Sequence, residues 1–305
     1  AIDSPQHRAI RWLANTDPRK LTVADTEEFR TRYALTVFYF ATSGQYWVYE
    51  KEVSWLTMEH HCNWKTKWPG ASGKRIEIGV ECDDTNSIVT KIFLPSMDLQ
   101  GTIPREIRLL SGLKVLDLYN NAMHGPVPND MAALTKLTSL VLHKNHFQGS
   151  IPEWLPSLHQ LQSIDLSGNF MGGTIPENIC DLKTLKDLNL ERNLLTGRID
   201  TLHRCRKLRF LALGENELTG SFTDSLLQQW SLLTDLDLSN NKLQGELPSE
   251  LFSMTLKVID LHGNGFNGTI PDRHAANSAL EFLALFGNQL TGTIGSNIEK
   301  LVNLR

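Results

Sequence analysis

The sequence LTSLVLHKNHFQGSIP, residues 137–152, decides the fold of this chain. The preceding block, LKVLDLYNNAMHGPVP at residues 113–128, places its apolar residues, asparagine, glycine and proline at the same positions. Asparagines then continue the series at steps of 24, 24, 23, 25, 23 and 24 residues from Asn145, namely at Asn169, Asn193, Asn216, Asn241, Asn264 and Asn288. A period of this length is typical of a solenoid in which each repeat forms one coil.

The repeat itself indicates how each coil is built. Alternating leucines predict a short strand with both leucines facing inward, and stacked coils then align their strands in a parallel sheet. The asparagine amide can satisfy backbone groups inside the turn. A glycine follows the asparagine by four residues in each complete block, where the missing Cβ permits a sharp bend; these are Gly125, Gly149, Gly173, Gly197, Gly220, Gly245, Gly268 and Gly292.

This pattern resembles the plant-type leucine-rich repeat family, whose signature places L-x-G-x-I-P after the asparagine. The resemblance implies an α/β fold, a right-handed solenoid with a concave parallel β-sheet and short convex helical turns. Residues 89–305 would hold about nine repeats and a truncated last one. The chain departs from the signature at Met97, Asp200, Thr223 and Gly295.

Residues 1–88 do not repeat and are predicted to form a helical capping region. A helix is expected over Pro5–Ala14, with Ser4 as its N-cap and with Ile10 and Leu13 facing inward. A second helix is expected from Asp25 to Ala41, ended by Gly44. Its inward face would carry Phe29, Tyr33, Val37 and Phe40.

The end of this region resembles the family's amino-terminal cap, C-x-W-x-G-V-x-C, divided here by an insertion at Lys65–Ile78. The resemblance implies a disulfide between Cys62 and Cys82. The helical segment also resembles the extended caps of leucine-rich repeat proteins from diatom-like algae. Cys180 and Cys205 lie one coil apart, and both a bridge and two free buried thiols remain open for them.

Charge and composition exclude several classes of function. The chain carries 30 Lys and Arg against 34 Asp and Glu, a net charge of −4, so it has no basic excess for nucleic acid. Its longest apolar stretch, Tyr33–Ala41, is too short to cross a bilayer. The sequon at Asn267 predicts glycosylation and favours secretion.

A recognition surface is predicted on the outward positions of the sheet. Aromatic and charged side chains on a rigid scaffold are typical of binding surfaces. The predicted ligand-binding residues are Tyr119, His143, Lys144, Asp187, Glu191, Arg192 and Phe210. An ordinary soluble face is the alternative, since every repeat must place some residue outward.

Catalysis, metal binding and cofactor binding are not expected. Ser167, His143 and Asp165 have the residue types of a nucleophile triad, and Ser239, His262 and Asp260 echo them, but the family consensus L-D-L-S-x-N explains these residues better. In the sequence His60-His61-Cys62, the resemblance assigns the Cys62 thiol to the cap disulfide, so the thiol is not expected to bind a metal. The basic residues Arg204, Arg206, Lys207 and Arg209 are either solvated or able to recognise an acidic glycan.

These observations predict an extracellular module that recognises a protein, peptide or glycan ligand, as part of a tethered receptor-like or adhesion protein. The alternative is a secreted soluble binder resembling polygalacturonase-inhibiting proteins. A structural or ice-binding repeat protein is the third interpretation, because the residues at equivalent outward positions of successive coils do not form a regular series. No capping cysteine pair follows Leu301, which predicts that further coils lie beyond Arg305.

Overall fold

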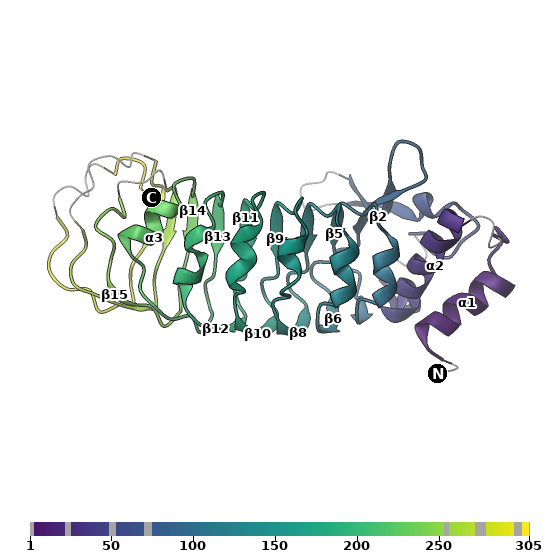
Figure 1. Ribbon diagram of the computed structural model, residues 1–305, viewed down its shortest axis with the longest axis horizontal. Helices are drawn as coiled ribbons and strands as arrows, with labels where there is room; N and C mark the ends of the chain where they lie inside the picture. Colours follow the sequence, from purple (N-terminus) through teal and green to yellow (C-terminus); the bar gives the residue numbers. More distant parts are fainter. Residues whose placement is uncertain are drawn as a thin grey trace. The chain divides into compact units, whose positions relative to one another are not determined.

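The computed structural model describes residues 3–21, 26–48, 53–69, 75–252, 256–271, 279–295 and 301–304. The chain forms two compact units, residues 1–148 and residues 149–305 (Figure 1). Among the described residues, no helix has both the length and the apolar character needed to cross a membrane.

The first unit begins with helix α1, Pro5–Asn15. The Ser4 hydroxyl accepts a hydrogen bond from the His7 N–H at 3.2 Å, which confirms the predicted N-cap. Ala9 and Leu13, four residues apart, form the buried side of the helix, whereas Ile10 is 55% exposed. The prediction for Ile10 was wrong because the face defined by Ala9 and Leu13 is the one that packs on the next helix.

Helix α2 spans Thr26–Ala41, and it packs against both α1 and the 3-10 turn η3, Arg105–Leu109. Of the four residues predicted to face inward, only Val37 is fully buried. The buried set instead surrounds the helix, because neighbours cover it on more than one side; it comprises Thr31, Arg32, Ala34, Leu35, Thr36, Val37, Phe38 and Tyr39. Gly44 begins a separate 3-10 turn, η1, at Gly44–Tyr46. The predicted start at Asp25 lies outside the described residues.

A hairpin joins these helices to the repeats. Strands β1, Lys65–Pro69, and β2, Arg75–Cys82, are antiparallel and occupy most of the predicted insertion; the 3-10 turn η2, His61–Asn63, precedes them. Strand β2 pairs antiparallel with β3, Val89–Phe93, so the hairpin extends the repeat sheet across the predicted boundary at residue 88.

The remainder of the first unit consists of coils. Strand β3 pairs in parallel with β5, Val115–Asp117, and β5 with β7, Ser139–Val141. A second set of short parallel strands follows the asparagines: β4, Gln100–Gly101; β6, Ala122–Gly125; and β8, His146–Ser150. Turns η3 and η4, Asn129–Ala133, return the chain to the next strand.

The second unit repeats this plan. Its parallel sheet runs through β9, Ser163–Asp165; β11, Asp187–Asn189; β13, Phe210–Ala212; β14, Asp235–Asp237; β16, Val258–Asp260; and β18, Phe282–Ala284. Short strands pair as β10, Phe170–Thr174, with β12, Leu194–Thr196, and as β15, Gln244–Glu246, with β17, Gly265–Asn267.

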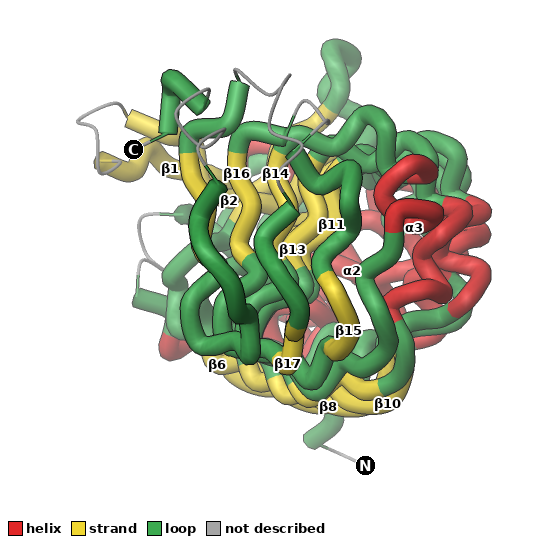
Figure 2. Tube along the Cα trace, turned by 90° about the vertical axis from the view of Figure 1, so that its left-hand side faces the viewer, coloured by secondary structure: helices red, strands yellow, loops and turns green. Residues whose placement is uncertain are grey.

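Helical turns close the coils of the second unit on the side opposite its parallel sheet (Figure 2). They are η5, Leu155–Ser157; η6, Glu177–Asp181; η7, Ile199–Arg204; and helix α3, Asp224–Gln229. We call the solvent-facing side of the parallel sheet in each unit its sheet face.

The asparagines form the predicted ladder. The Asn121 carboxamide oxygen accepts hydrogen bonds from the N–H groups of Met97 and Leu99, and its nitrogen donates to the carbonyls of Leu94 and Leu118 at 2.8 and 2.9 Å. The corresponding asparagines of later coils donate to equivalent carbonyls, and Asn216 and Asn241 each accept from one N–H group of the preceding coil. At Gly197, φ is +90° and a Cβ would meet Thr174 at 2.9 Å, so the glycine is required there.

Two disulfides connect the cysteines. Cys62 is bonded to Cys82 with Cα atoms 5.5 Å apart, as the cap resemblance implied. Cys180 is bonded to Cys205 with Cα atoms 4.5 Å apart, which settles the alternative left open by the sequence. The second bridge links the end of η6 to the residue that follows η7.

Candidate recognition surface

In the first unit, the structure brings Tyr119 and His143 together on the sheet face. Each residue directly follows an inward leucine, Leu118 or Leu142, so their side chains project from neighbouring coils. The ring centroids lie 4.9 Å apart, with planes tilted by 60°. Lys144 follows at an exposed position with φ of +53°, and its carbonyl accepts a hydrogen bond from the Asn121 N–H. Three of the seven predicted residues thus lie close together in this unit.

In the second unit, Arg192 lies between two carboxylates. Its Nε is 3.3 Å from Glu191 Oε1, and its Nη2 is 2.8 Å from Glu215 Oε1. Glu215 was not among the predicted site residues, although it occupies the same place in its coil as Arg192. That shared repeat position is the signal that could have identified it.

The sheet face around Glu191 is acidic. Burial raises the pKa of the Glu191 carboxyl group, and the nearby carboxylates of Asp237, Glu215 and Asp165 raise it further, while Arg192 opposes them. Negative charge therefore accumulates on this part of the sheet face, with Arg192 as the cation beside it. Such a surface attracts a ligand that carries positive charge.

Asp187 and Phe210 lie side by side at the edge of the same face, as register partners on β11 and β13. The Phe210 side chain is 37% exposed. Burial raises the pKa of Asp187, although Lys186 and Arg209 act in the opposite direction. The structure thus places an exposed aromatic ring next to a half-buried carboxyl group.

A second aromatic site lies near the last described coils. His262 stacks on Phe286 with ring centroids 4.4 Å apart and planes at 14°. Phe286 is 68% exposed and Phe282 is 43% exposed. The predicted ligand-binding residues did not include His262, which occupies the same position in its coil as His143 and Phe286.

The contacts of the serines do not favour the triad alternative. The Ser167 hydroxyl donates to Asp165 Oδ1 at 2.7 Å. His262 Nδ1 contacts Asp260 Oδ1 at 2.6 Å, but its Nε2 faces the Asn240 side chain at 2.9 Å instead of a serine hydroxyl. A serine nucleophile must donate a hydrogen bond from its hydroxyl to the histidine that acts as base, and both ring nitrogens of His262 already contact other groups.

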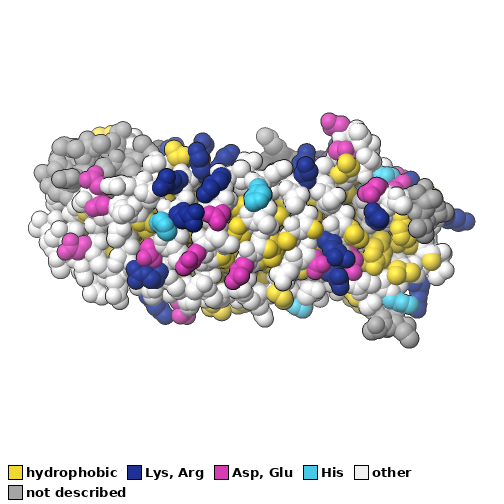
Figure 3. All heavy atoms as spheres, viewed as in Figure 1, with side chains coloured by type: hydrophobic (Ala, Val, Ile, Leu, Met, Phe, Trp, Pro, Cys, Tyr) yellow, Lys and Arg dark blue, Asp and Glu magenta, His cyan; other side chains and the backbone are white. Residues whose placement is uncertain are grey.

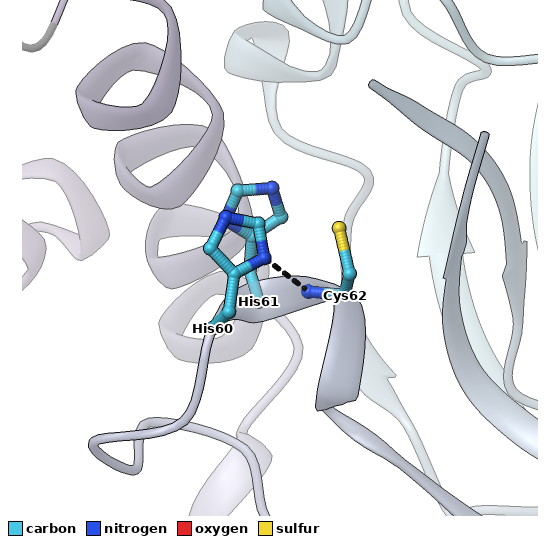
Figure 4. Close-up of side chains that lie close together, drawn as sticks. All are labelled: His60, His61 and Cys62. Atoms are coloured by element: carbon cyan, nitrogen blue, oxygen red, sulfur yellow. Dashed lines mark hydrogen bonds between the residues drawn. The ribbon is translucent and has the colours of Figure 1, made fainter. Parts of the chain in front are cut away.

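His60, His61 and Cys62 lie together in the cap, with one possible ligand atom of each within 4.8 Å of the others (Figure 4). The Cys62 sulfur is bonded to Cys82, and His60 Nδ1 accepts a hydrogen bond from the Cys62 N–H. His61 is fully buried, and burial, followed by His60, Arg32 and Arg19, lowers its pKa to about 3. The Cys62 sulfur is thus not free to act as a ligand, and the absence of a metal site here stays a prediction.

Comparison with known proteins agrees with the coil geometry. The Leucine rich repeat profile matches residues 135–195, and a second profile, Leucine Rich Repeat, matches residues 232–254 and 255–274. The chain folds as a leucine-rich repeat solenoid. It is related to receptor-like proteins and to the ectodomains of receptor kinases.

One relative is Receptor-like protein 31 of Arabidopsis thaliana, 33% identical over 100 residues, which is 32% of this chain and 12% of that protein. This solenoid therefore matches only about an eighth of that relative's length. The resemblance of its cap to algal proteins stays a prediction.

Two solved structures are similar over most of the solenoid. The ectodomain of the Arabidopsis receptor kinase HAESA, in complex with an extended IDA peptide hormone, is 27% identical with a TM-score of 0.68, over 92% of this chain and 48% of that one. A plant ice-binding protein is 25% identical with a TM-score of 0.68, over 90% of this chain and 91% of that one.

Proposed function

We propose that this solenoid is an extracellular recognition module that binds a peptide or protein ligand on the sheet face of its second unit. The observation that carries the proposal is that one sheet face presents both the exposed Phe210 ring, beside Asp187, and the acidic group around Glu191 and Glu215. An aromatic anchor supplies apolar contact area, and the carboxylates supply orientation and selectivity.

The charges specify the ligand further. Glu191 is surrounded by Asp165, Asp237 and Glu215, and a lysine or arginine of a bound peptide would relieve the repulsion among them. Arg192 offers a guanidinium group that can bind a ligand carboxylate in bidentate geometry. A peptide with a basic residue and a nearby carboxylate fits both features.

The comparisons support a peptide ligand. HAESA is described in complex with a peptide hormone, and another similar ectodomain, the plant peptide hormone receptor RGFR1, in complex with RGF2. The two disulfides and the exposed Asn267, which lies in a glycosylation sequon, support an extracellular setting. We place the module in a receptor-like or adhesion protein tethered to the cell surface.

Binding to an arrayed library of synthetic peptides graded in net charge tests the proposal. Captured peptides should be enriched in lysine and arginine, and Phe210→Ala should weaken their binding by more than about 1 kcal/mol. Glu191→Gln combined with Glu215→Gln should remove the preference for basic peptides. Leu194→Ala, an exposed apolar residue on the short strand β12, is the matched control and should bind like the wild type. Equal capture by all variants would move the ligand away from this face.

The soluble-inhibitor alternative makes a different prediction. A panel of cell-wall hydrolases should slow in the presence of the purified solenoid, and Phe210→Ala should relieve the inhibition. Unchanged hydrolase rates across the panel would leave the peptide-binding module as the better account.

Ice binding is a second function to test, because the similarity to the plant ice-binding protein covers nearly all of both chains. The residues that directly follow the repeat glycines form one column along the coils, and this column is the surface that could match an ice lattice. It contains Thr174, Thr269 and Thr293, but Arg198 and Glu246 interrupt it. A lattice-matching surface needs regularity, so we expect no thermal hysteresis; a measurable hysteresis gap would make ice binding the leading function.

A further inference from the structure

A basic patch lies on two adjacent coils of the second unit, away from the acidic part of its sheet face. Its members are exposed lysines and arginines from the helical turns and from the entries to β11 and β13 (Figure 3). We define the patch as Lys183, Lys186, Arg204, Arg206, Lys207 and Arg209.

Two hollows open on the patch and share part of their walls. One has a volume of about 420 Å³ and is lined by Lys183, Arg204, Arg206 and Lys207 around the Cys180–Cys205 bridge. The other, of about 370 Å³, is lined by Lys183, Lys186, Lys207 and Arg209. Lys183 and Lys207 belong to both, and neither hollow has a carboxylate in its wall. Together the hollows form a positively charged site that extends over two coils.

The fold fixes these cations in position. Lys186 and Arg209 follow the first leucines of successive coils, and the Arg209 N–H donates to the Lys186 carbonyl at 2.7 Å. Arg204 and Arg206 flank Cys205, whose bond to Cys180 ties the two coils together. Because the backbone beneath the side chains is cross-linked, less conformational entropy is lost when a ligand orders them.

Few internal partners neutralise the patch. Arg204 contacts Asp181 at 3.3 Å, and the Lys186 ammonium donates to the neutral Gln162 side chain at 2.9 Å. Within the described part of the chain, Arg206, Lys207 and Arg209 have no ion pair. Their charge remains available to an anionic ligand, even though the whole chain has a net charge of −4.

We propose that the basic patch binds an acidic polysaccharide. Such a polymer repeats its anionic groups along an extended chain, as the two hollows repeat their cations along successive coils. The three guanidinium groups can bind carboxylates or sulfates in bidentate geometry, while the lysines act as point charges. An acidic protein partner fits less well, because neither hollow has an aromatic residue in its wall to anchor one. This site adjoins Asp187 and Phe210 through Lys186 and Arg209, but it uses a different set of side chains and does not depend on the peptide site proposed above.

The test is titration calorimetry of the intact chain with polygalacturonate, heparin and neutral dextran at low and high salt. Polygalacturonate carries carboxylates alone, whereas heparin carries sulfates as well, so the two together show whether carboxylates suffice; tight binding of either one supports the proposal. Affinity should fall steeply with salt, since counterions are released when charges pair. Arg206→Glu with Lys207→Glu should weaken binding by at least about tenfold, because two charged contacts are reversed.

The control variant, Lys67→Glu with Lys114→Glu, makes the same change in net charge at exposed lysines of the first unit. It should bind within about twofold of the wild type, because it leaves the patch intact. An equal loss of affinity in both variants would show a general charge effect and overturn the proposal. Polyglutamate bound as tightly as either polysaccharide would overturn it too, as would polysaccharide binding that neither salt nor the patch variant weakens.

Discussion

The capping region, residues 1–88, and the coils that follow bury polar groups in opposite ways. In the coils, each buried asparagine shares its hydrogen bonds between neighbouring turns, and every coil repeats the arrangement. In the cap, the main buried polar side chains do not repeat; they are above all the Arg32–Asp17 pair and His61. Stability in the coils is thus distributed, whereas in the cap it depends on a few contacts without substitutes.

The Arg32–Asp17 pair is the clearest example. Both side chains are inaccessible to solvent, and two nitrogens of Arg32 donate to the two carboxylate oxygens of Asp17 at 2.7 and 2.8 Å. The carbonyls of Thr57 and Glu59 accept hydrogen bonds from two further N–H groups of Arg32, and the ring of Trp64 lies 4.6 Å from the guanidinium carbon. One ion pair therefore connects helix α2 with three other segments of the cap.

Breaking this pair should have the largest effect. Asp17→Ala leaves a buried guanidinium group without its counter-charge, and we expect the free energy of unfolding to fall by about 3–5 kcal/mol. Urea unfolding followed by tryptophan fluorescence measures this in the cap, where Trp47, Trp55 and Trp64 pack together. Replacing both partners, with Asp17→Leu and Arg32→Met, should recover much of the loss; no recovery would mean that the charges themselves hold the segments together.

Removing one rung of the asparagine ladder should cost less. Asn121→Ala leaves the N–H groups of Met97 and Leu99 and the Leu94 carbonyl without this partner, and we expect a loss of about 2–3 kcal/mol in the first unit. Asn216→Ala should cost a similar or slightly smaller amount in the second unit, since Asn216 donates to equivalent carbonyls but accepts from one N–H group, that of Leu195. Thermal melts of both variants check this, and a large difference between them would contradict a ladder of equivalent rungs.

Acidification should distinguish the cap from the coils. His61 has a pKa of about 3 when folded and about 6.5 when unfolded, so the unfolded chain takes up the proton first. Stability from this group is complete above pH 6.5 and is lost as the pH falls toward 3, at up to about 1.4 kcal/mol per pH unit. Unfolding monitored at a series of pH values should show this slope, and His61→Phe should flatten it. His124→Gln, an exposed histidine of the first unit, should leave it unchanged.

The same contrast explains what the sequence could predict. The solenoid, the asparagine ladder and the Cys62–Cys82 bridge were predicted because periodicity or a family motif constrains them. The inward face of α2 was not, because its neighbours come from distant segments, and no pattern signals that Arg32 is buried against Asp17. The contact between Tyr119 and His143 follows from their equivalent positions in successive repeats. The ion pair between Arg192 and Glu215, by contrast, depends on side-chain conformation.

The smallest expected effect, at Glu191, has the opposite sign of pH dependence. Burial and neighbouring carboxylates raise the pKa of Glu191, so its ionised form costs stability above that raised pKa, and the cost disappears as the pH falls below the ordinary glutamate pKa. Glu191→Gln should therefore slightly raise the melting temperature at neutral pH, with a gain that shrinks on acidification. Glu217→Gln, an exposed carboxylate paired with Lys242, is the control and should give no gain.

A lower melting temperature for Glu191→Gln at neutral pH would show that its contact with Arg192 outweighs the repulsion. The expected gain would mean that the sheet face keeps a destabilising carboxylate, which is typical of a residue retained for binding. In the cap, by contrast, the buried histidine stabilises the fold only while it is neutral. Opposite pH slopes in the two variants would thus separate a group buried for structure from one kept on the sheet face for recognition.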